Sequence, residues 1–529
     1  MSQEKFTAQI QAEYTFTGRS VILGGSVYDK KPVPGLIVRL PLATVNRHGL
    51  VAGATGTGKT KSIQRIAESL SELGVNVLLM DIKGDISGIS KAGTENPKIK
   101  ERMGMVGLPW APQEYPTELM TISGEKGLRL RATVSEFGPV LFSKILELNE
   151  NQEGTVAIVF KYCDDHQLPL LDIKDFRATL NFVTTGDGKK EVEENYGLIS
   201  PTSAGVVMRK LLELEQQGGD LFFGEKSFEV EDLLQKTSDG KAYINILRLT
   251  DIQDRPKLFS TFMLCLLAEI YNKFPEVGDK GEPKLAIFID EAHLIFREAS
   301  EALMDQIETI IKLIRSKGVG IFFCTQAPTD IPNIILSQLG TKIQHALRAF
   351  TAKDRKDIKL VAENFPLTDF YVTDQLITEL GTGEALVTVL SEKGTPTPLV
   401  HTMMCAPQSR MDIITPEEQD EKIAASKIAR FYNEVIDRES AYEMLKAKIA
   451  PADQPVQQPV PQPQKTTYPE IKVKIPKSQP APKPTTSDAG KTLKKIANSS
   501  ITKTVLREVT RGLFGVLLGK KIKGGKSIF

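Results

Sequence analysis

The 529-residue sequence has no apolar run approaching the ~20 residues that a membrane-spanning helix needs, so we expect no integral membrane segment. Residues 1–11 lack the apolar core of a secretory signal peptide. The four cysteines lie far apart without a CxxC pair, which argues against a zinc site or a disulfide framework and favours a reducing cytoplasm. One tryptophan and eleven tyrosines provide few rings for stacking on nucleic-acid bases.

Charge is also unevenly distributed, although the whole chain carries a net charge of only +1. Residues 451–529 hold 15 Lys and Arg against 4 Asp and Glu, which leaves 52 against 62 for residues 1–450. The body is therefore acidic and the tail is basic. An acidic body is not expected to attract nucleic acid over its whole surface, so such contact would need a local basic channel.

Residues 53–60 match the P-loop (Walker A) pattern GxxxxGK[ST], between a predicted short strand at 49–52 and a predicted helix at 59–73. Glycines let backbone N–H groups close around phosphate oxygens, while the lysine reaches the β- and γ-phosphates and the threonine hydroxyl binds Mg²⁺. The N-terminus of the helix favours the same anion. The predicted site for ATP and Mg²⁺ consists of Gly53, Ala54, Thr55, Gly56, Thr57, Gly58, Lys59 and Thr60.

A buried strand predicted at 285–289 is followed by two adjacent acids, Asp290 and Glu291 (Walker B). Asp290 provides the hard oxygen that Mg²⁺ prefers, and Glu291 can act as general base toward the attacking water. Adjacent acids at the end of an apolar strand are costly unless metal or water lies between them. Glu291 also argues against a kinase or transferase, because a kinase deprotonates its acceptor in a separate substrate site.

Polar residues follow two more predicted strands. Gln326 follows the strand at 320–324, where its amide could contact the γ-phosphate or orient water, although a surface glutamine gives the same pattern. Asp81 ends the strand at 75–80 and, with Lys83, could line the crevice at the carboxyl ends of parallel strands, but a plain turn fits equally well.

The letters DEAH at 290–293 also occur in superfamily 2 helicases. Those enzymes place two RecA-like lobes on one chain, and only one convincing core is present here. We therefore interpret His293 as a packing or interface residue.

Taken together, these segments resemble the HerA–FtsK superfamily of P-loop motor ATPases, and most closely the bacterial YjgR-like, HerA-type proteins. The resemblance rests on NRHG at 46–49 before the P-loop, DIKG at 81–84, DEAH at 290–293 and RSKGVGI at 315–321 before Thr325 and Gln326. It implies a RecA-like core with an additional strand, ring hexamers, and ATP-driven helicase or translocase action on DNA.

The resemblance also implies residue roles. Lys59 and Thr60 match the phosphate lysine and the metal hydroxyl, Asp290 and Glu291 the metal acid and the catalytic base, and Gln326 the sensor glutamine. Two arginines, Arg315 and Arg348, lie where the superfamily keeps arginines near its strands. Either could act across a subunit boundary, with Arg315 preferred, although an ordinary salt bridge is an equally good interpretation of each.

The sequence departs from its relatives in three places. Only 52 residues precede Gly53, so we expect no β-barrel of the HerA type. Membrane spans of the FtsK type and a DNA-reading winged helix are not recognisable either. The DNA function therefore comes by analogy of family alone.

Rapid alternation of short strands and amphipathic helices predicts an α/β fold with a mainly parallel sheet, interrupted by a mostly helical insertion and followed by a Pro-rich disordered linker. The linker is predicted because residues 451–484 contain ten prolines and little to bury. The predicted divisions are a short N-terminal β segment (1–45), the first part of the ATPase core (46–99), the helical insertion (100–240), the second part of the core (241–414), a C-terminal helix (415–450), the linker (451–490) and a basic amphipathic tail (491–529).

Two functions stay open at this point. The first is a cytoplasmic, ring-forming, HerA-like motor ATPase that acts on DNA. The alternative is a nucleotide-dependent assembly or switch ATPase, recruited by its basic tail to a protein or membrane partner without DNA translocation. The tail suits an anionic surface or a partner groove because apolar residues recur every four positions along 501–517, but a solubilising tail is equally consistent.

Overall fold

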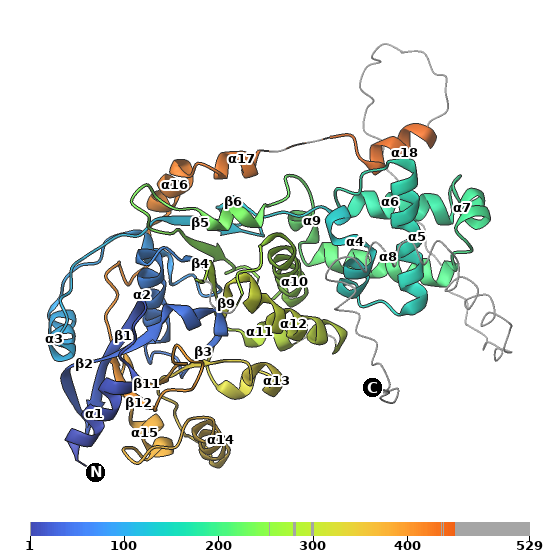
Figure 1. The fold of residues 1–529 in the computed structure, drawn as a ribbon. Coiled ribbons are helices and arrows are strands. Elements are labelled where there is room, and N and C mark those ends of the chain that lie inside the picture. The colour runs from blue at the N-terminus through green and yellow to red at the C-terminus, as the bar shows by residue number, and fades with distance from the viewer. Residues whose placement is uncertain are drawn as a thin grey trace, which may run out of the picture.

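The structure, a computed structural model, describes residues 2–449 except 253, 279–281, 298–300, 435 and 437. Twelve strands in this part of the chain form one sheet, in the order β2-β1-β12-β11-β10-β3-β9-β8-β4-β7-β5-β6 (Figure 1). The strands are β1 (Ser20–Tyr28), β2 (Lys31–Pro41), β3 (Gly49–Ala52), β4 (Asn76–Asp81), β5 (Thr117–Thr121), β6 (Leu128–Arg129), β7 (Ile244–Arg248), β8 (Leu285–Ile289), β9 (Val319–Thr325), β10 (Thr341–Gln344), β11 (Glu384–Thr388) and β12 (Val400–Met404).

Helices surround this sheet and extend beyond one of its edges. They are α1 (Gln3–Glu13), α2 (Lys59–Glu72), α3 (Pro97–Val106), α4 (Val134–Ile145), α5 (Glu150–His166), α6 (Ile173–Thr184), α7 (Lys189–Asn195), α8 (Pro201–Gln216), α9 (Gly219–Phe222), α10 (Pro256–Lys273), α11 (His293–Arg297), α12 (Glu301–Ile314), α13 (Asn333–Leu336), α14 (Ala352–Glu363), α15 (Thr373–Glu379), α16 (Pro416–Ala425), α17 (Ala429–Asn433) and α18 (Ala441–Ile449). Among the described residues, none of the helices combines the length and apolar character that crossing a bilayer requires.

The sheet has a parallel and an antiparallel part. From β10 to β6 every neighbouring pair of strands is parallel, whereas β11, β12, β1 and β2 continue the sheet in antiparallel pairs. The predicted α/β class with a mainly parallel sheet is confirmed. Strand β9 lies between β3, which leads into residues 53–60, and β8, which precedes the two acids. Three polar segments therefore follow three neighbouring strands at the carboxyl ends of these strands, called here the carboxyl edge.

Both faces of the sheet are buried, as parallel strands require. In β8, Leu285, Ile287 and Ile289 belong to the core on one face, which also holds the apolar stripe of α12. Ala286 and Phe288 belong to the core on the other face, with the stripe of α2. The short apolar strands are thus continuous hydrophobic runs because helices cover them on both sides.

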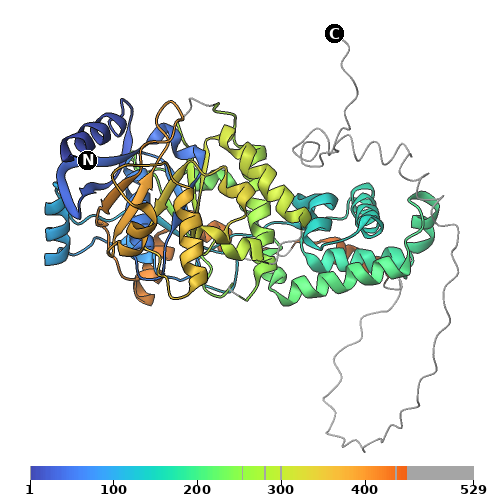
Figure 2. The same ribbon diagram turned by 90° about the horizontal axis from the view of Figure 1, so that it is seen from below.

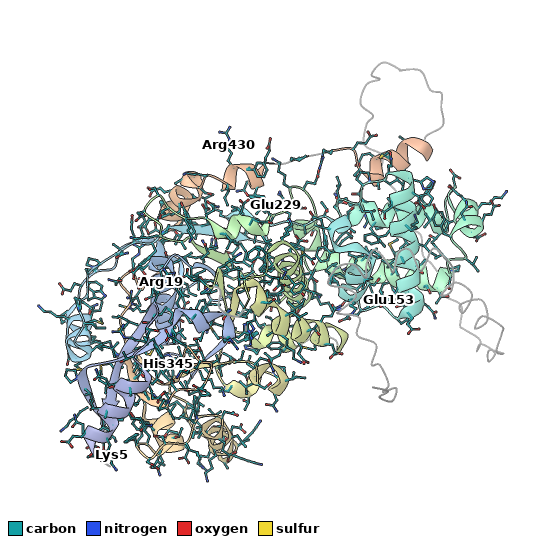
Figure 3. All side chains as sticks on the ribbon, in the orientation of Figure 1. Lys5, Arg19, Glu153, Glu229, His345 and Arg430 are labelled. Atoms are coloured by element: carbon teal, nitrogen blue, oxygen red, sulfur yellow. The ribbon has the colours of Figure 1, made fainter. Side chains whose placement is uncertain are left out.

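The helices α4–α9 form a helical body that projects beyond the β6 edge of the sheet (Figures 1 and 2). Glu153, labelled in Figure 3, belongs to its helix α5. The last described helix, α18, joins this body: the Ala441 N–H donates to Pro169 O at 3.0 Å, and the Tyr442 N–H donates to Asp175 Oδ1 at 2.9 Å. The chain after β12 therefore crosses from the sheet to the helical body.

Three segments differ from the sequence-based expectations. Residues 3–13 form α1, whose buried face is too short for a visible period because it contains only Phe6 and Ile10. Within 100–240, residues 117–129 contribute β5 and β6 to the sheet. The predicted helix at 415–450 is replaced, in the described residues, by the three short helices α16, α17 and α18. The predicted linker and amphipathic tail, 451–529, lie outside the described residues.

Candidate nucleotide site

The loop at 53–60 connects β3 to α2, and two of its glycines combine positive φ with close packing. Gly53 and Gly58 have φ of 153° and 110°, and a Cβ on Gly58 would lie 2.9 Å from the backbone N of Gly383. Hydrogen bonds hold the loop from outside: the Ala54 N–H donates to Ala346 O at 2.8 Å, and the Gly383 N–H donates to Thr57 O at 2.8 Å. The loop is thus shaped by packing before any ligand binds, with the first turn of α2 directed at it.

Lys59 folds over this loop. Its ammonium donates to Gly53 O at 2.5 Å and to Ala54 O at 3.2 Å. Burial lowers the pKa of Lys59, and the nearby positive charge of Lys83 lowers it further. A phosphate at this point would replace these carbonyl acceptors with a full negative charge, which forms stronger hydrogen bonds.

Asp290 and Glu291 leave the end of β8 side by side and almost fully buried. The Asp290 N–H donates to Met80 O at 3.3 Å, and the Ala292 N–H donates to Cys324 O at 2.9 Å, so both neighbouring strands hold this turn. Glu291 has φ of 45°, a conformation that L-residues avoid and that persists where surrounding bonds impose it. Backbone strain therefore coincides with the residue predicted to act as general base.

The two acids differ electrostatically. Burial raises the pKa of Asp290 to about 6, an effect that the positive charge of Lys83 partly offsets. Burial also opposes ionisation of Glu291, but the hydrogen bond and charge of Lys83 outweigh it and hold the pKa of Glu291 below its usual value. Glu291 is thus the carboxylate that stays ionised, as a general base must.

The loop after β4 brings further groups to the same edge. The Asp81 carboxylate accepts hydrogen bonds from the N–H groups of Gly84, Asp85 and Ile86 at 2.7, 3.2 and 3.2 Å, so Asp81 shapes a turn and does not line the crevice. Lys83 pairs with Glu291 Oε1 and lies 4.0 Å from Asp290 Oδ2. The sequence left open whether these two residues form a plain turn or line the crevice. Asp81 forms the turn, and Lys83 lines the crevice.

The surroundings of Asp290 fit a magnesium ion. Within the described residues, its buried Oδ2 has no hydrogen-bond partner, and an unpaired buried carboxylate oxygen is costly without a cation. The Thr60 hydroxyl, the other predicted ligand, donates to Asp85 Oδ2 at 3.4 Å. No group of three or more His, Cys, Asp or Glu in this part of the chain is arranged as a metal site. Mg²⁺ would thus need water and phosphate oxygens to complete its shell.

Gln326 follows β9 and lies exposed at the mouth of the site. Its side-chain hydrogen bond contributes to holding the pKa of Glu291 down. Gln326 and His293 line one open groove, and His293 Nδ1 lies 3.3 Å from Glu291 Oε2. His293 is therefore a neighbour of the acid pair and not only a packing residue.

The two candidate arginines lie at opposite ends of the parallel strands. Arg348 follows β10 on the carboxyl edge, is exposed, and donates to Thr378 O at 2.8 Å. Arg315 precedes β9, at the amino ends of the parallel strands, called here the amino edge. At ~3.3 Å per residue, the length of β9 places it roughly 20 Å from the carboxyl edge, where the P-loop lies. An arginine side chain cannot span that distance, so Arg315 cannot reach the P-loop of its own chain.

Arg315 lines a cleft of about 540 Å³ on the amino edge, together with Arg47, Lys312 and Lys342. Two residues of the NRHG segment hold the end of α12 there: the Asn46 amide donates to Arg315 O at 3.4 Å, and His48 Nε2 donates to Ile311 O at 2.8 Å. His48 Nδ1 accepts the Ile321 N–H at 3.0 Å, which sets its tautomer. These side chains position the backbone that carries Arg315.

A P-loop after β3 and an acid pair after β8, with one additional parallel strand, β9, between these two, define the class of RecA-like P-loop ATPase folds. Among solved structures, the bacterial conjugative coupling protein TrwBdeltaN70 has a TM-score of 0.51 with 13% identity, covering 77% of this chain and 94% of that one. The RecA-like part of the predicted fold is thereby confirmed.

The family profile described as "Helicase HerA-like C-terminal" matches residues 29–523, and the chain belongs to this family. The predicted resemblance to HerA-type proteins is thus confirmed. The chain is 24% identical over 395 residues to the DNA import protein CedB of Sulfolobus acidocaldarius, covering 73% of this chain and 57% of that protein. It is also 24% identical over 356 residues to the DNA double-strand break repair helicase HerA of Saccharolobus solfataricus, covering 66% and 63%. It therefore spans about three-fifths of each relative.

Sequence reasoning missed three residues at the site: Asp85, His345 and Gly383. His345, labelled in Figure 3, packs its Cβ where a side chain on Gly53 would lie, and its N–H donates to Ala52 O at 2.7 Å. Asp85 carried a weak signal, since it follows the DIKG segment. Gly383 carried none, because its contact with the loop depends on β11 lying beside β10.

Proposed function

We propose that this protein is a Mg²⁺-dependent ATP hydrolase. The observation that carries the proposal is the meeting of the P-loop, the acid pair and Gln326 at the ends of three neighbouring strands, β3, β8 and β9. Hydrolysis of ATP requires a phosphate cradle, a metal ligand and a base close together, and the carboxyl edge supplies all three.

The roles follow from position. Loop N–H groups and Lys59 would bind the phosphates, and Thr60 and Asp290 would hold Mg²⁺, which would supply positive charge to the transferred phosphoryl group. Glu291 accepts the proton of the attacking water, and Gln326 orients that water or responds to the γ-phosphate. Each role is part of the proposal.

The test compares two variants of the full-length protein. Lys59→Ala should weaken ATP binding, whereas Glu291→Gln should bind ATP and lose about 10²–10⁴-fold in turnover because the base is gone. Binding is measured with a fluorescent ATP analogue and hydrolysis by phosphate release. Full turnover by purified Glu291→Gln would refute the assignment.

We further propose that the ATPase is a motor that acts on DNA as a ring, hexameric by family resemblance. The relatives named for DNA repair and DNA import support DNA as the substrate. The basic cleft around Arg315 supports ring assembly, because that arginine can act only on a neighbour's nucleotide. The cytoplasmic location stays a prediction.

The alternative, an assembly or switch ATPase without translocation, is favoured by the acidic body and the basic residues 451–529. ATP hydrolysis measured with and without single- or double-stranded DNA separates the two functions. Stimulation by DNA supports the motor. Unchanged hydrolysis at low salt supports the switch, with a protein or anionic membrane as partner of the tail.

A further inference from the structure

Lys83 brings a positive charge to the two acids that follow β8. Its ammonium pairs with Glu291 Oε1 and lies 4.0 Å from Asp290 Oδ2. Among the described residues, Lys83 is the only lysine or arginine in ion-pair contact with both carboxylates. Its side chain is 33% exposed, whereas the acid side chains are 5% and 8% exposed, so Lys83 reaches them from the solvent side.

The backbone of Lys83 is held by the turn that follows it, whereas its partly exposed side chain contacts the acids through the terminal ammonium. Three N–H groups that follow it, those of Gly84, Asp85 and Ile86, bind the buried Asp81 carboxylate. The four-carbon stem of lysine ends in a point charge that suits several acceptors. Lys83 can therefore leave the acids without any change in the turn that carries it.

A divalent cation at Asp290 needs the space and the charges that Lys83 now uses. An ammonium ion and a metal ion ~4 Å apart repel each other, and a unit charge at this distance changes an affinity by a factor on the order of ten or more. Both cannot be held by the same two acids. The two acids would therefore hold one cation at a time, either the Lys83 ammonium or the metal ion.

We propose that Lys83 occupies the place of the metal while no nucleotide is bound, and that it turns toward solvent when Mg²⁺ arrives with ATP. This inference rests on the proposed ATPase function and adds a regulation of the same site. Lys83 keeps Mg²⁺ alone from binding and keeps Glu291 paired until substrate is present. Metal binding then depends on nucleotide, and Lys83 is a positioning residue.

The test measures metal binding in the absence of nucleotide. Full-length protein is titrated with Mn²⁺, which has a similar preference for oxygen ligands, and free Mn²⁺ is followed by electron paramagnetic resonance. Lys83→Met should bind Mn²⁺ about tenfold more tightly than the wild type, because the competing charge is removed. Lys83→Arg, which keeps the charge, should bind as weakly as the wild type.

The matched control is Lys126→Met, which removes a lysine that pairs with Asp420 at 2.8 Å on the exposed surface. It should leave Mn²⁺ affinity unchanged. Equal Mn²⁺ affinity of Lys83→Met and the wild type would overturn the proposal. So would a tightening in Lys83→Arg equal to that in Lys83→Met.

A second measurement needs only the wild type. Millimolar Mg²⁺ alone should leave its Tm unchanged, whereas Mg²⁺ with a non-hydrolysable ATP analogue should raise it. A large rise with Mg²⁺ alone would overturn the proposal even if Lys83→Met fails to fold. Failure of the ATPase assignment looks different, since the wild type would then show neither nucleotide binding nor hydrolysis.

Discussion

The two edges of the parallel sheet differ in the side chains that they carry. At the carboxyl edge, loops pinned by backbone hydrogen bonds carry the phosphate cradle and the buried acids. At the amino edge, Arg315 lines an open cleft with three other basic residues. Both edges belong to the same strands, so they face in opposite directions. Within a single copy, Arg315 therefore lies far from the P-loop.

In the proposed ring, a second copy in the same orientation would remove this separation. The amino edge of one copy would then face the carboxyl edge of the next, which is a head-to-tail contact that closes into a ring when the rotation permits. In such a ring, the direction of the strands would make the active site depend on assembly.

The largest effect is expected at the amino edge. Arg315→Ala should lower turnover by about 10³–10⁵-fold, the range for arginines that stabilise phosphoryl charge across a subunit boundary. Mixing Arg315→Ala subunits with Lys59→Ala subunits should partly restore hydrolysis, because each supplies what the other lacks. Phosphate release from the mixture measures this.

Arg348→Ala is the control for that prediction, since Arg348 lies on the carboxyl edge and contacts Thr378 O. It should not complement Lys59→Ala. No restoration with Arg315→Ala, together with a monomeric mass by light scattering in ATP, would contradict the comparison of edges.

The next largest effect concerns the rigid loop of the carboxyl edge. Gly58→Ala should destabilise the nucleotide-free protein by about 1–3 kcal/mol and impair ATP binding, because its Cβ would meet the backbone of Gly383 at positive φ. Gly56→Ala is the matched control, with φ of 76° but open space around its Cβ. Thermal unfolding of both variants measures the difference. Equal loss in both would mean that φ alone, and not packing against Gly383, sets the cost.

An effect of similar size for each residue is expected from acid, and it should reach both edges alike. Burial lowers the pKa of His48 at the amino edge and of His345 at the carboxyl edge to about 4. The unfolded chain, with histidine pKa near 6.5, then binds more protons between pH 6.5 and 4, so stability falls as the pH falls through this window. Each histidine should cost about 2 kcal/mol at pH 5.

Urea unfolding at pH 7 and pH 5 checks this prediction. His48→Gln should lower stability at pH 7 and reduce the loss between the two pH values. An unchanged loss in that variant would show that His48 is not the titrating group.

The smallest effect is expected from removing 451–529. Basal ATP hydrolysis should stay nearly intact, while any binding of the full chain to anionic liposomes or DNA at low salt should weaken sharply. That binding should also weaken between ~50 and ~200 mM salt through release of counterions. Loss of hydrolysis or of folding in the truncated protein would place this segment in the core.

Local patterns account for what could be predicted from the sequence. Leu285–Ile289 is a continuous apolar run between polar segments, so the bounds of this strand and the two acids after it could be predicted. The loop at 53–60 has its own motif. Lys83 was predicted only as an alternative, because its contact with Glu291 requires β4 to lie beside β8, and no local pattern encodes neighbouring strands.

Tertiary context explains the rest. Thr117–Thr121 is short and flanked by Pro and Gly, and it becomes a strand because β7 pairs with it. The separation of Arg315 from its own P-loop follows from the direction of β9. A parallel sheet implies that direction, but the position of Arg315 relative to the P-loop was not predicted. The hydrogen bonds by which Asn46 and His48 hold the C-terminal end of α12 could not be predicted from either segment alone.

The pairing of β1 with β12 can form only after β12 has been synthesised. Gly24 lies opposite Met404, so the strand made nearly first receives its partner nearly last. At the usual 5–20 residues per second, β1 waits about 20–80 s on the ribosome before β12 emerges. During that interval the edge of β1 that later pairs with β12 is unpaired, which makes it a template for wrong association. Protection of this edge by chaperones should therefore matter until β12 has emerged.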